Sequence, residues 1–396
     1  MTVLQVMPAY YPATTYGGPI FSVHYACQAL AQIGVGIRVA TTNANGRSKL
    51  DVPTNRAVAF EPNYVVRYYD DSAAGRFSLP FALGLWRDVK AAGVVHLQDI
   101  YSAHAIETLV LARLLARPLL VSPRGSFSDW ALTKRKPRLK QMTLSLISSL
   151  TDRGRRVAWH ATSPEERAEV LSLFPGATVH VVPNGIDCAP FDRAEALSRD
   201  RYLARFFPAA AVAADEAQIL IAMGRLHRKK CFEVVIEALR LVSERFPDAV
   251  LLIAGGDDGE RARLEAMTAA SGLRGRAALV GELSGEDKIA FLKGADLFLF
   301  PSHSENFGMS CLEALAAGLP VVASRNTPWS AVEVAGCGLW VENSAPAFAA
   351  AIDRLLGSNL SAMRDNARAH AGGYDIAMIA GALRQIYQDL IDGHAG

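Results

Sequence analysis

Charged residues are absent from the first part of this chain, where no Asp, Glu, Lys or Arg precedes Arg38. Polar residues, glycine and proline interrupt this stretch, among them Gln5, Pro8, Gly17 and His24, and no basic segment precedes an apolar run. A signal peptide needs a basic start, and a membrane-spanning helix needs about 20 apolar residues. We therefore expect neither of them here.

Cysteine is scarce and scattered. The chain has 5 Cys, and neighbouring ones are never closer than 26 residues. An odd number at such spacing provides neither a disulfide framework nor the Cys-x-x-Cys pair of a zinc site. No Asp-x-Asp pair occurs either, so that type of metal clamp is also lacking. We expect free thiols in a reducing cytoplasm and no metal site.

Composition and charge indicate an ordered globular protein of two domains. Apolar types make up 51% of the 396 residues and charged types 20%, and at roughly 150 residues per domain two cores are expected. The net charge of +2 is unevenly distributed, because residues 1–190 carry 20 Lys and Arg against 13 Asp and Glu, while the remainder carries 21 against 26. The basic half is too weak for nucleic-acid binding but suits an anionic membrane face.

Short runs rich in Val, Ile and Leu alternate with helical patterns along the chain, which is typical of a parallel, doubly wound sheet. We predict an α/β protein with two Rossmann-like domains, 1–187 and 188–374, and a last helix in 375–396 that packs back on the first domain. Ligands of such sheets bind beyond the carboxyl ends of strands, so we expect the site in a cleft between the domains. The predicted strands are 3–7, 37–41, 94–97, 119–122, 157–160 and 179–182, then 219–223, 250–254, 278–280, 297–300 and 321–323.

A basic loop follows the first predicted strand of the second domain. It contains Gly224, Arg225 and Lys230 and leads into a helix. Glycine lets the backbone approach a ligand closely, and two cations near a helix start suit a diphosphate. Taken alone, such a loop is more often a solvated surface.

A second polar segment follows the fourth predicted strand of that domain. Glu305 lies at the carboxyl end of the strand, and Glu313 lies two turns into the next helix. The backbone N–H groups of Gly308, Met309 and Ser310 begin this helix, where phosphate oxygens can accept from them. A carboxylate in an apolar helix needs hydrogen-bond donors, and the two hydroxyls of a ribose supply them. The alternative is that Glu313 faces solvent.

These two loops resemble the signature of the retaining, nucleotide-sugar-dependent glycosyltransferases of family 4, which have the GT-B fold. The resemblance also includes the segments PNGID at 183–187 and EALAAGLPVV at 313–322. It covers nearly the whole chain, with the motifs in the family's order. It implies a retaining hexosyltransferase that uses a GDP- or UDP-linked sugar, requires no metal or other cofactor, and works in cell-surface polysaccharide biosynthesis.

The resemblance also implies roles for individual residues. The catalytic residues would be Arg225, Lys230 and Glu305. The donor nucleotide would be bound by Gly224, Gly281, Leu283 and Glu313, the last at the ribose. The donor sugar and diphosphate would be bound by Gly17, Gly18, Asn306, Phe307, Gly308, Met309 and Ser310.

Two positions depart from the family pattern. Many relatives have a His after the strand 119–122, whereas this chain has Arg124, which we expect on the acceptor side, at a phosphate or a hydroxyl. The glycine that often follows the diphosphate-binding lysine is Cys231 here, a change that we expect to affect only helix packing. His96 and His160, at the ends of predicted strands, fit a structural role better than a catalytic one.

A basic amphipathic segment covers residues 134–150. Its cations are Lys134, Arg135, Lys136, Arg138 and Lys140, and its apolar stripe is Leu139, Met142, Leu146 and Leu150. This pattern predicts peripheral docking on the anionic inner face of the cell membrane, where a lipid-linked saccharide acceptor would be found. An ordinary helix with its stripe in the core fits the pattern equally well.

Three alternatives to this function are a transferase with a soluble small-molecule acceptor, a nucleotide-sugar 2-epimerase and a noncatalytic binding module. The carboxylate and His pattern of the epimerases is not found, and a binding module would have lost some diphosphate residues. Only the segment 134–150 favours a lipid-linked acceptor over a soluble one. We expect a cytoplasmic protein whose partners are a nucleotide sugar and a saccharide, with no nucleic acid.

Overall fold

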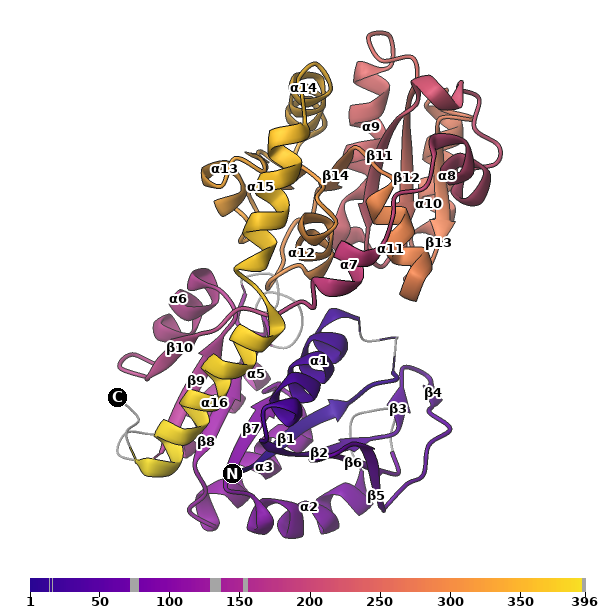
Figure 1. Ribbon diagram of the computed structural model, residues 1–396. Coiled ribbons are helices and arrows are strands. Elements are labelled where there is room, and N and C mark those ends of the chain that lie inside the picture. Colours follow the sequence, from indigo (N-terminus) through magenta and orange to yellow (C-terminus); the bar gives the residue numbers. More distant parts are fainter. Residues whose placement is uncertain (14, 16, 72–77, 129–136, 152–155, 394–396) are drawn as a thin grey trace. The chain divides into compact units, whose positions relative to one another are not determined.

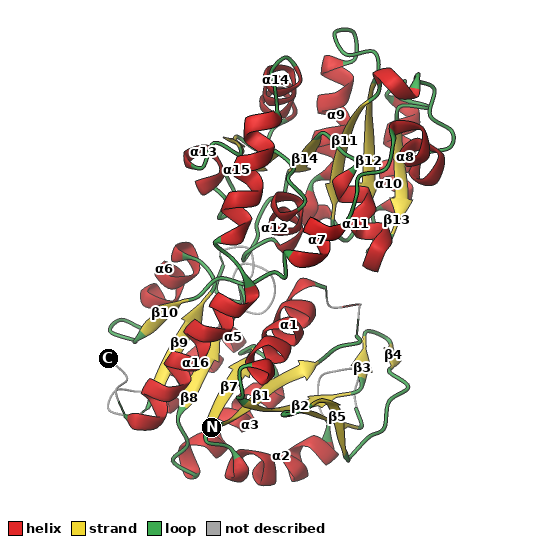
Figure 2. Cartoon of the chain, in the orientation of Figure 1, coloured by secondary structure: helices red, strands yellow, loops and turns green. Residues whose placement is uncertain are grey.

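The computed structural model describes residues 1–13, 15, 17–71, 78–128, 137–151 and 156–393. Its chain divides into two compact units, one of Met1–Gly185 with Ile376–Gly396 and the other of Ile186–Asp375 (Figure 1). Each unit has a largely parallel sheet with helices packed on it (Figure 2). The predicted fold class, two doubly wound α/β units, is confirmed.

The sheet of the first unit has the order β10-β9-β8-β7-β1-β2-β6-β5, with only β5 antiparallel to its neighbour. The strands are β1 (Thr2–Ala9), β2 (Gly36–Thr42), β5 (Ala57–Glu61), β6 (Tyr64–Tyr69), β7 (Val94–Gln98), β8 (Leu119–Ser122), β9 (Val157–Ala161) and β10 (Val179–Val181), besides a small hairpin of β3 (Ala44–Asn45) and β4 (Ser48–Lys49). The helices are α1 (Gly18–Gln32), α2 (Leu79–Ala91), α3 (Ala103–Leu114), α5 (Pro137–Leu150), α6 (Pro164–Leu173) and α16 (Ile376–Asp392).

The last helix, α16, belongs to the first unit although it follows the whole of the second in sequence. Its apolar stripe of Ile379, Leu383, Ile386, Tyr387 and Leu390 is buried in the core that α1 and β1 also line. Burying one apolar stripe is what an amphipathic helix requires. The unit therefore closes its core with residues from both ends of the chain.

The sheet of the second unit has the order β13-β12-β11-β14-β15-β16, and all pairs are parallel. The strands are β11 (Gln218–Met223), β12 (Ala249–Ala254), β13 (Ala277–Gly281), β14 (Leu297–Phe300), β15 (Val321–Ser324) and β16 (Gly338–Val341). The helices are α7 (Ala189–Arg193), α8 (Arg199–Phe206), α9 (Phe232–Val242), α10 (Arg261–Ala270), α11 (Gly285–Lys293), α12 (Met309–Ala316), α13 (Ala331–Val334), α14 (Ala345–Leu356) and α15 (Ser361–Gly372), with short 3-10 turns η2 (Ala214–Glu216) and η3 (Arg228–Lys230).

Strand order reverses once in each sheet, between β1 and β7 in the first unit and between β11 and β14 in the second. At such a point the loops after the two central strands diverge to opposite faces and leave a crevice beyond the strand ends, which is where open α/β sheets bind ligands. Ligands are therefore expected at the loops after β1 and β7–β8 in one unit and at those after β11 and β14 in the other.

Candidate functional site

The loops after β11 and β14 lie together at the switch point of the second unit. Residues 224–231 leave β11 and residues 301–308 leave its neighbour β14. A backbone hydrogen bond of 2.9 Å from His303 N to Lys229 O joins the two loops directly. The basic loop after β11 and the acidic loop after β14, both predicted from the sequence, thus lie at the same edge of one sheet.

Lys230 and Glu305 form an ion pair between these loops. Their side chains are only 18% and 12% exposed, so solvent screens the pair weakly. Burial raises the pKa of Glu305, but the charge and the hydrogen bond of Lys230 outweigh it and hold the pKa below its ordinary value. Glu305 therefore stays ionised and holds the ammonium of Lys230.

Gly224 makes room for this lysine. A Cβ atom at position 224 would lie 3.2 Å from Cε of Lys230, closer than ordinary van der Waals contact. Gly255 follows the neighbouring strand β12, and a Cβ there would lie 1.8 Å from the carbonyl oxygen of Gly224. The close approach of the two strand ends thus depends on glycine.

Arg225 is not brought to this pair. Its guanidinium Nη1 donates to Asp258 Oδ2 over 2.8 Å, and the two side chains are 51% and 42% exposed. An exposed ion pair of this kind contributes about 0–1 kcal/mol. Arg225 can therefore leave Asp258 for another anion at little cost.

The start of α12 offers backbone donors. Gly308 precedes the helix with φ of 92°, and a Cβ there would lie 2.6 Å from the ring of Phe300. The first helical bonds run from Cys311 N and Leu312 N to Gly308 O. The N–H groups of Met309 and Ser310 come before those bonds, as expected for the orphan donors of a helix start.

Several helix starts, that of α12 among them, have no side-chain cap. Serine side chains accept from the first turns of α2, α3, α6 and α14. In contrast, α1 begins after Gly17 and α12 after Gly308, and neither glycine has a side chain that could cap. Gly17, Gly18 and Gly308, which are predicted to bind the donor phosphates, therefore lie at helix starts that no side chain caps.

Phe307 and Asn306 connect Glu305 to that helix. The ring of Phe307 is 6% exposed and packs against Trp329 and Tyr374, and its carbonyl accepts from Trp329 Nε1 over 2.5 Å. The Phe307 side chain thus anchors the loop in the core. Asn306 is half-buried beside it.

Glu313 lies within α12 and forms an ion pair of 2.7 Å with Lys288 of α11. Both side chains are largely buried. This partner was not predicted, because it comes from a helix 25 residues earlier and no local pattern marks it. The carboxylate is therefore not a solvent-facing glutamate, and Oε1 already accepts from a cation.

Gly281 is the last residue of β13 and Leu283 follows it, and this strand pairs with β12 on the side away from β11. Gly281 O accepts from Gly255 N over 2.7 Å, and a Cβ at Gly281 would meet no atom within 4 Å. Leu283 packs partly against the core of this unit. The open backbone at Gly281 lies at the same edge of the sheet as the ion pair of Lys230.

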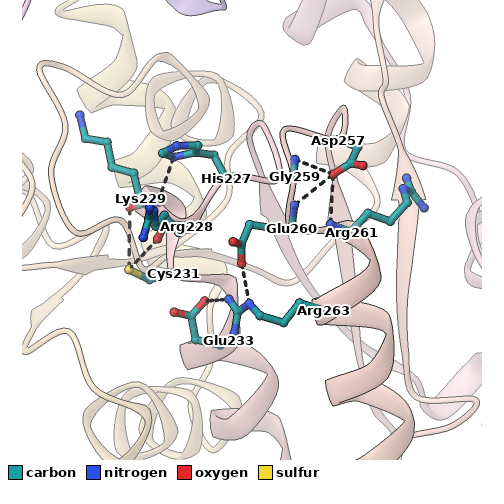
Figure 3. A network of polar contacts seen from close by, with 10 residues as sticks. All are labelled: His227, Arg228, Lys229, Cys231, Glu233, Asp257, Gly259, Glu260, Arg261 and Arg263. Atoms are coloured by element: carbon teal, nitrogen blue, oxygen red, sulfur yellow. Dashed lines mark hydrogen bonds and ion pairs between the residues drawn. The ribbon is translucent and has the colours of Figure 1, made fainter.

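A polar network lies in the loop after β12 and the first turn of α10, next to the loop after β11 (Figure 3). Asp257 Oδ1 accepts from the backbone N–H groups of Gly259, Glu260 and Arg261 over 3.0–3.1 Å, and these bonds, that of Arg261 foremost, lower the pKa of Asp257. Arg263 then joins Glu260 on this segment to Glu233 of α9. Asp257 was not among the residues predicted from the sequence, because its backbone-capping role becomes visible only in the fold.

Cys231 corrects one expectation. It has φ of 50°, in the left-handed region that favours glycine, between η3 and α9. Its thiol lies within hydrogen-bond range of the carbonyl oxygens of Arg228 and Lys229 (Figure 3). The expectation that replacing the family's glycine concerns only helix packing is wrong, because the replacement places a side chain on a backbone that strains it.

In the first unit, Arg124 lies in the loop after β8, with φ of 53°. Its Nε donates to Gln98 Oε1 and its Nη1 to Asn184 Oδ1, each over 2.8 Å. His96 and His160 are buried and bonded to Ser122 on either side. Their positions agree with the structural role expected for both histidines.

The segment 134–150 is described in part. Residues 134–136 lie outside the described residues, and α5 begins at Pro137, with side chains described from Met142 onward. Met142 is 70% exposed and Leu146 is also exposed, while Ile147 is buried. Of the predicted stripe, Met142 and Leu146 therefore face outward, whereas Leu150 packs partly against the same core as Ile147.

The helix α2 carries a second exposed apolar stripe, which the sequence analysis missed. Leu79, Leu83 and Trp86 follow each other at helical spacing, and Leu83 is 72% exposed. The neighbouring Arg87 and Lys90 are exposed as well, while the one carboxylate of the helix, Asp88, is buried. Over the described part of the chain, no helix is both long and apolar enough to cross a membrane.

Sequence comparison identifies relatives of both units. The family model described as glycosyl transferases group 1 matches residues 205–371, and the model of glycosyltransferase family 4 matches residues 16–190. A D-inositol 3-phosphate glycosyltransferase of Corynebacterium jeikeium is 31% identical over 248 residues, which are 58% of this chain and 57% of that protein. The match thus spans little more than half the length of that relative.

Solved structures agree over nearly the whole chain. WaaG, a glycosyltransferase involved in lipopolysaccharide biosynthesis, has a TM-score of 0.72 at 18% identity, covering 99% of this chain and 100% of that one. The Anabaena protein HepE, solved in complex with UDP, has a TM-score of 0.75 at 16% identity, covering 98% and 100%. These likenesses concern the fold. With two family models that together cover most of its length, the chain belongs to the group 1 and family 4 glycosyltransferases and has their GT-B fold.

Proposed function

We propose that this glycosyltransferase moves a hexose from a UDP- or GDP-linked sugar to a saccharide hydroxyl with retention of anomeric configuration. The observation that carries the proposal is the grouping of Lys230, Glu305 and the uncapped start of α12 at the switch point of one sheet. A cation and helix-start donors at such a crevice suit a nucleoside diphosphate. HepE, a structural neighbour, was solved with UDP, which supports this choice of donor.

The diphosphate is bound in this proposal by Lys230 and by the N–H groups of Met309 and Ser310. Glu313 and Lys288 lie one helical turn or more beyond, at the ribose end. Arg225 moves from Asp258 to the phosphates when the donor binds. Gly281 lies where a planar base can stack on open backbone.

The transfer itself exchanges one bond at the anomeric carbon. The bond from the anomeric carbon to the diphosphate oxygen breaks with its electron pair, the acceptor oxygen bonds from the same face, and an oxygen of the leaving diphosphate takes the hydroxyl proton. Charge grows on the diphosphate during this step, so fixed donors at Lys230 and the start of α12 stabilise the transition state more than the ground state. No residue of this set acts as a base, and no metal takes part.

Proton NMR of the product tests reaction type, stereochemistry and metal dependence together. We expect a nucleotide sugar and a saccharide acceptor to give a glycoside whose new anomeric bond has the donor's configuration, at an unchanged rate in excess chelator. An inverted bond, or a rate that chelator abolishes and manganese restores, contradicts the proposal. An altered sugar nucleotide formed without acceptor would identify a 2-epimerase instead.

For the acceptor, we propose a lipid-linked saccharide met at an anionic membrane face. Two exposed apolar stripes support this: Leu79, Leu83 and Trp86 on α2, and Met142 with Leu146 on α5. Exposed basic residues accompany the first stripe, which suits anionic headgroups. WaaG is likewise described as acting in lipopolysaccharide biosynthesis. A soluble acceptor remains the competing proposal, because the Corynebacterium relative is named for an inositol phosphate.

Vesicle flotation separates these acceptor proposals. We expect the protein to float with vesicles containing anionic lipid at low salt, and Leu83→Gln with Trp86→Gln to lower the bound fraction on the order of tenfold, because two exposed apolar side chains lose their burial in the bilayer. Val334→Gln is the matched control, since Val334 is an apolar residue of the other unit that is 93% exposed. Equal flotation of both variants, or none with the wild type, rejects the membrane proposal and leaves the soluble acceptor.

A further inference from the structure

Arg124 is held on a strained and tightly tied loop. It has φ of 53° and is followed by Gly125 with φ of 76°, so two successive residues adopt the left-handed conformation, which a side chain at 124 disfavours. The carboxylate of Glu166 ties the loop down by accepting from Gly125 N, Thr162 N and Thr162 Oγ1 over 2.7–2.9 Å. Glu166 is thereby occupied by other donors and does not bond Arg124.

One end of a buried hydrogen-bond chain starts at this arginine. A guanidinium can only donate, so the oxygen of the Gln98 amide faces Arg124 Nε, at 2.8 Å. The amide nitrogen of Gln98 then donates to Gln5 Oε1 over 2.8 Å, and Gln5 Nε2 donates to the hydroxyl of Tyr387 over 3.1 Å. The direction of every bond from Arg124 to α16 is thus set by the arginine.

The other end of the chain is the carbonyl oxygen of Val182, which can only accept. His160 Nε2, at 2.8 Å, must carry the proton, so its Nδ1 accepts from Ser122 Oγ over 2.8 Å. Ser122 in turn accepts from His96 Nε2 over 2.7 Å, and His96 Nδ1 accepts from the Tyr387 hydroxyl over 2.7 Å. Burial lowers the pKa of His160 to about 3 and that of His96 well below its ordinary value, so both rings are neutral.

The hydrogen-bond directions that follow from the two ends are consistent at Tyr387. One orientation of the seven bonds lets every group of the chain donate or accept as its chemistry allows. Arg124 is left with spare donors, because its bonds within the described residues use Nε and one Nη1 hydrogen and lead to amide oxygens, not to a carboxylate. Burial lowers the pKa of Arg124, and the charge of Glu166 offsets part of this. Arg124 is thus a partly desolvated cation with N–H donors to spare and no bonded anion. Such a group is suited to bind an anion.

We infer that Arg124 is the specificity-determining residue for an anionic acceptor: its free guanidinium edge binds a phosphate or carboxylate group of the acceptor, and the chain from Val182 to Arg124 positions it. The inference deepens the proposed function, on which it rests. An arginine at this place selects charge where a histidine would select a hydroxyl, because a rigid fork suits planar or tetrahedral oxyanions.

Titration calorimetry on the full chain, saturated with UDP or GDP so that the diphosphate site is filled, tests the inference. The probes are inorganic phosphate, glucuronate and glucose. We expect phosphate or glucuronate to bind and glucose to bind more weakly. We expect Arg124→Gln to lower the affinity for the anion on the order of tenfold, as for loss of charge-assisted hydrogen bonds. Arg124→Lys, which keeps the charge without the fork, is expected in between, and exposed Arg113→Gln is the control.

The outcomes separate this inference from the proposed function. Anion affinity that is the same in wild type and Arg124→Gln overturns the inference, whatever the nucleotide does. A loss of nucleoside diphosphate affinity in Arg124→Gln also overturns it, because Arg124 would then serve the donor. If no nucleoside diphosphate binds the wild type at all, the donor site fails, and phosphate binding at Arg124 is measured without it.

Tyr387→Phe tests the positioning chain separately. It removes one hydroxyl from the middle of the hydrogen-bond chain and leaves the apolar packing of the ring. We therefore expect the affinity for the anion to fall a few-fold and the acceptor KM to rise, with kcat little changed. Histidine nitrogen NMR supplies a readout that loss of packing would not move: His96 and His160 both carry the proton on Nε2 in the wild type. A proton on Nδ1 of either ring contradicts the directed chain.

Discussion

Lys230→Gln lowers kcat by on the order of 10²-fold, with a smaller change in the KM for the nucleotide sugar. Glutamine keeps a donor on a side chain one atom shorter but loses the positive charge, and negative charge is what the leaving diphosphate accumulates. Removal of one preorganised donor from an oxyanion-type site costs a factor of this size. Initial rates of nucleoside diphosphate release measure it, with half-buried Lys293→Gln of the same unit as control.

Stability must be kept apart from catalysis in this experiment, because Lys230 is the partner of a buried carboxylate. Breaking such a pair on one side destabilises strongly, whereas removing both charges is far milder. The double variant Lys230→Gln with Glu305→Gln therefore melts nearer the wild type than Lys230→Gln alone, yet stays on the order of 10²-fold slow. Recovery of activity along with stability in the double variant would assign Lys230 a structural role only.

Glu313→Ala weakens nucleoside diphosphate binding by on the order of tenfold or more. In the proposed function its carboxylate accepts from the ribose hydroxyls, and charge-assisted hydrogen bonds contribute more than neutral ones. The ion pair with Lys288 makes the prediction specific: a lysine cannot accept from the ribose hydroxyls, so Glu313→Ala with Lys288→Ala should bind no better than Glu313→Ala. Glu342→Ala, which breaks the exposed pair with Arg325, is the matched control and should leave binding unchanged.

The central strands and the switch point were predictable from the sequence. Buried parallel strands form continuous apolar runs, and the predicted strands 219–223 and 297–300 coincide closely with β11 and β14. The strands β5, β6 and β16 were missed. β5 and β16 are edge strands with partly exposed residues, and the apolar residues of β6 are interrupted by Arg67.

Side-chain partners were the part that sequence could not supply. Lys230 and Glu305 follow neighbouring strands, so topology brings them together, but Arg225 faces Asp258 and Glu313 faces Lys288 because of how separate loops and helices pack. The chain behind Arg124 joins residues from five strands or loops and the last helix, with no local spacing to mark it. Cys231 illustrates the same limit, since its left-handed backbone belongs to the turn between η3 and α9, which no local pattern marks.

Thermal unfolding with UDP, GDP, ADP and their sugar conjugates, on the wild type and on Glu313→Ala, tests the central claim most directly. A ligand that binds only the folded protein raises the melting temperature by mass action. The account predicts that one diphosphate and its sugar conjugate stabilise the wild type, and that the shift shrinks in Glu313→Ala but not in Glu342→Ala. Absence of any shift in the wild type, or an equal shift in Glu313→Ala, would contradict a nucleotide-sugar site between the ends of β11 and β14.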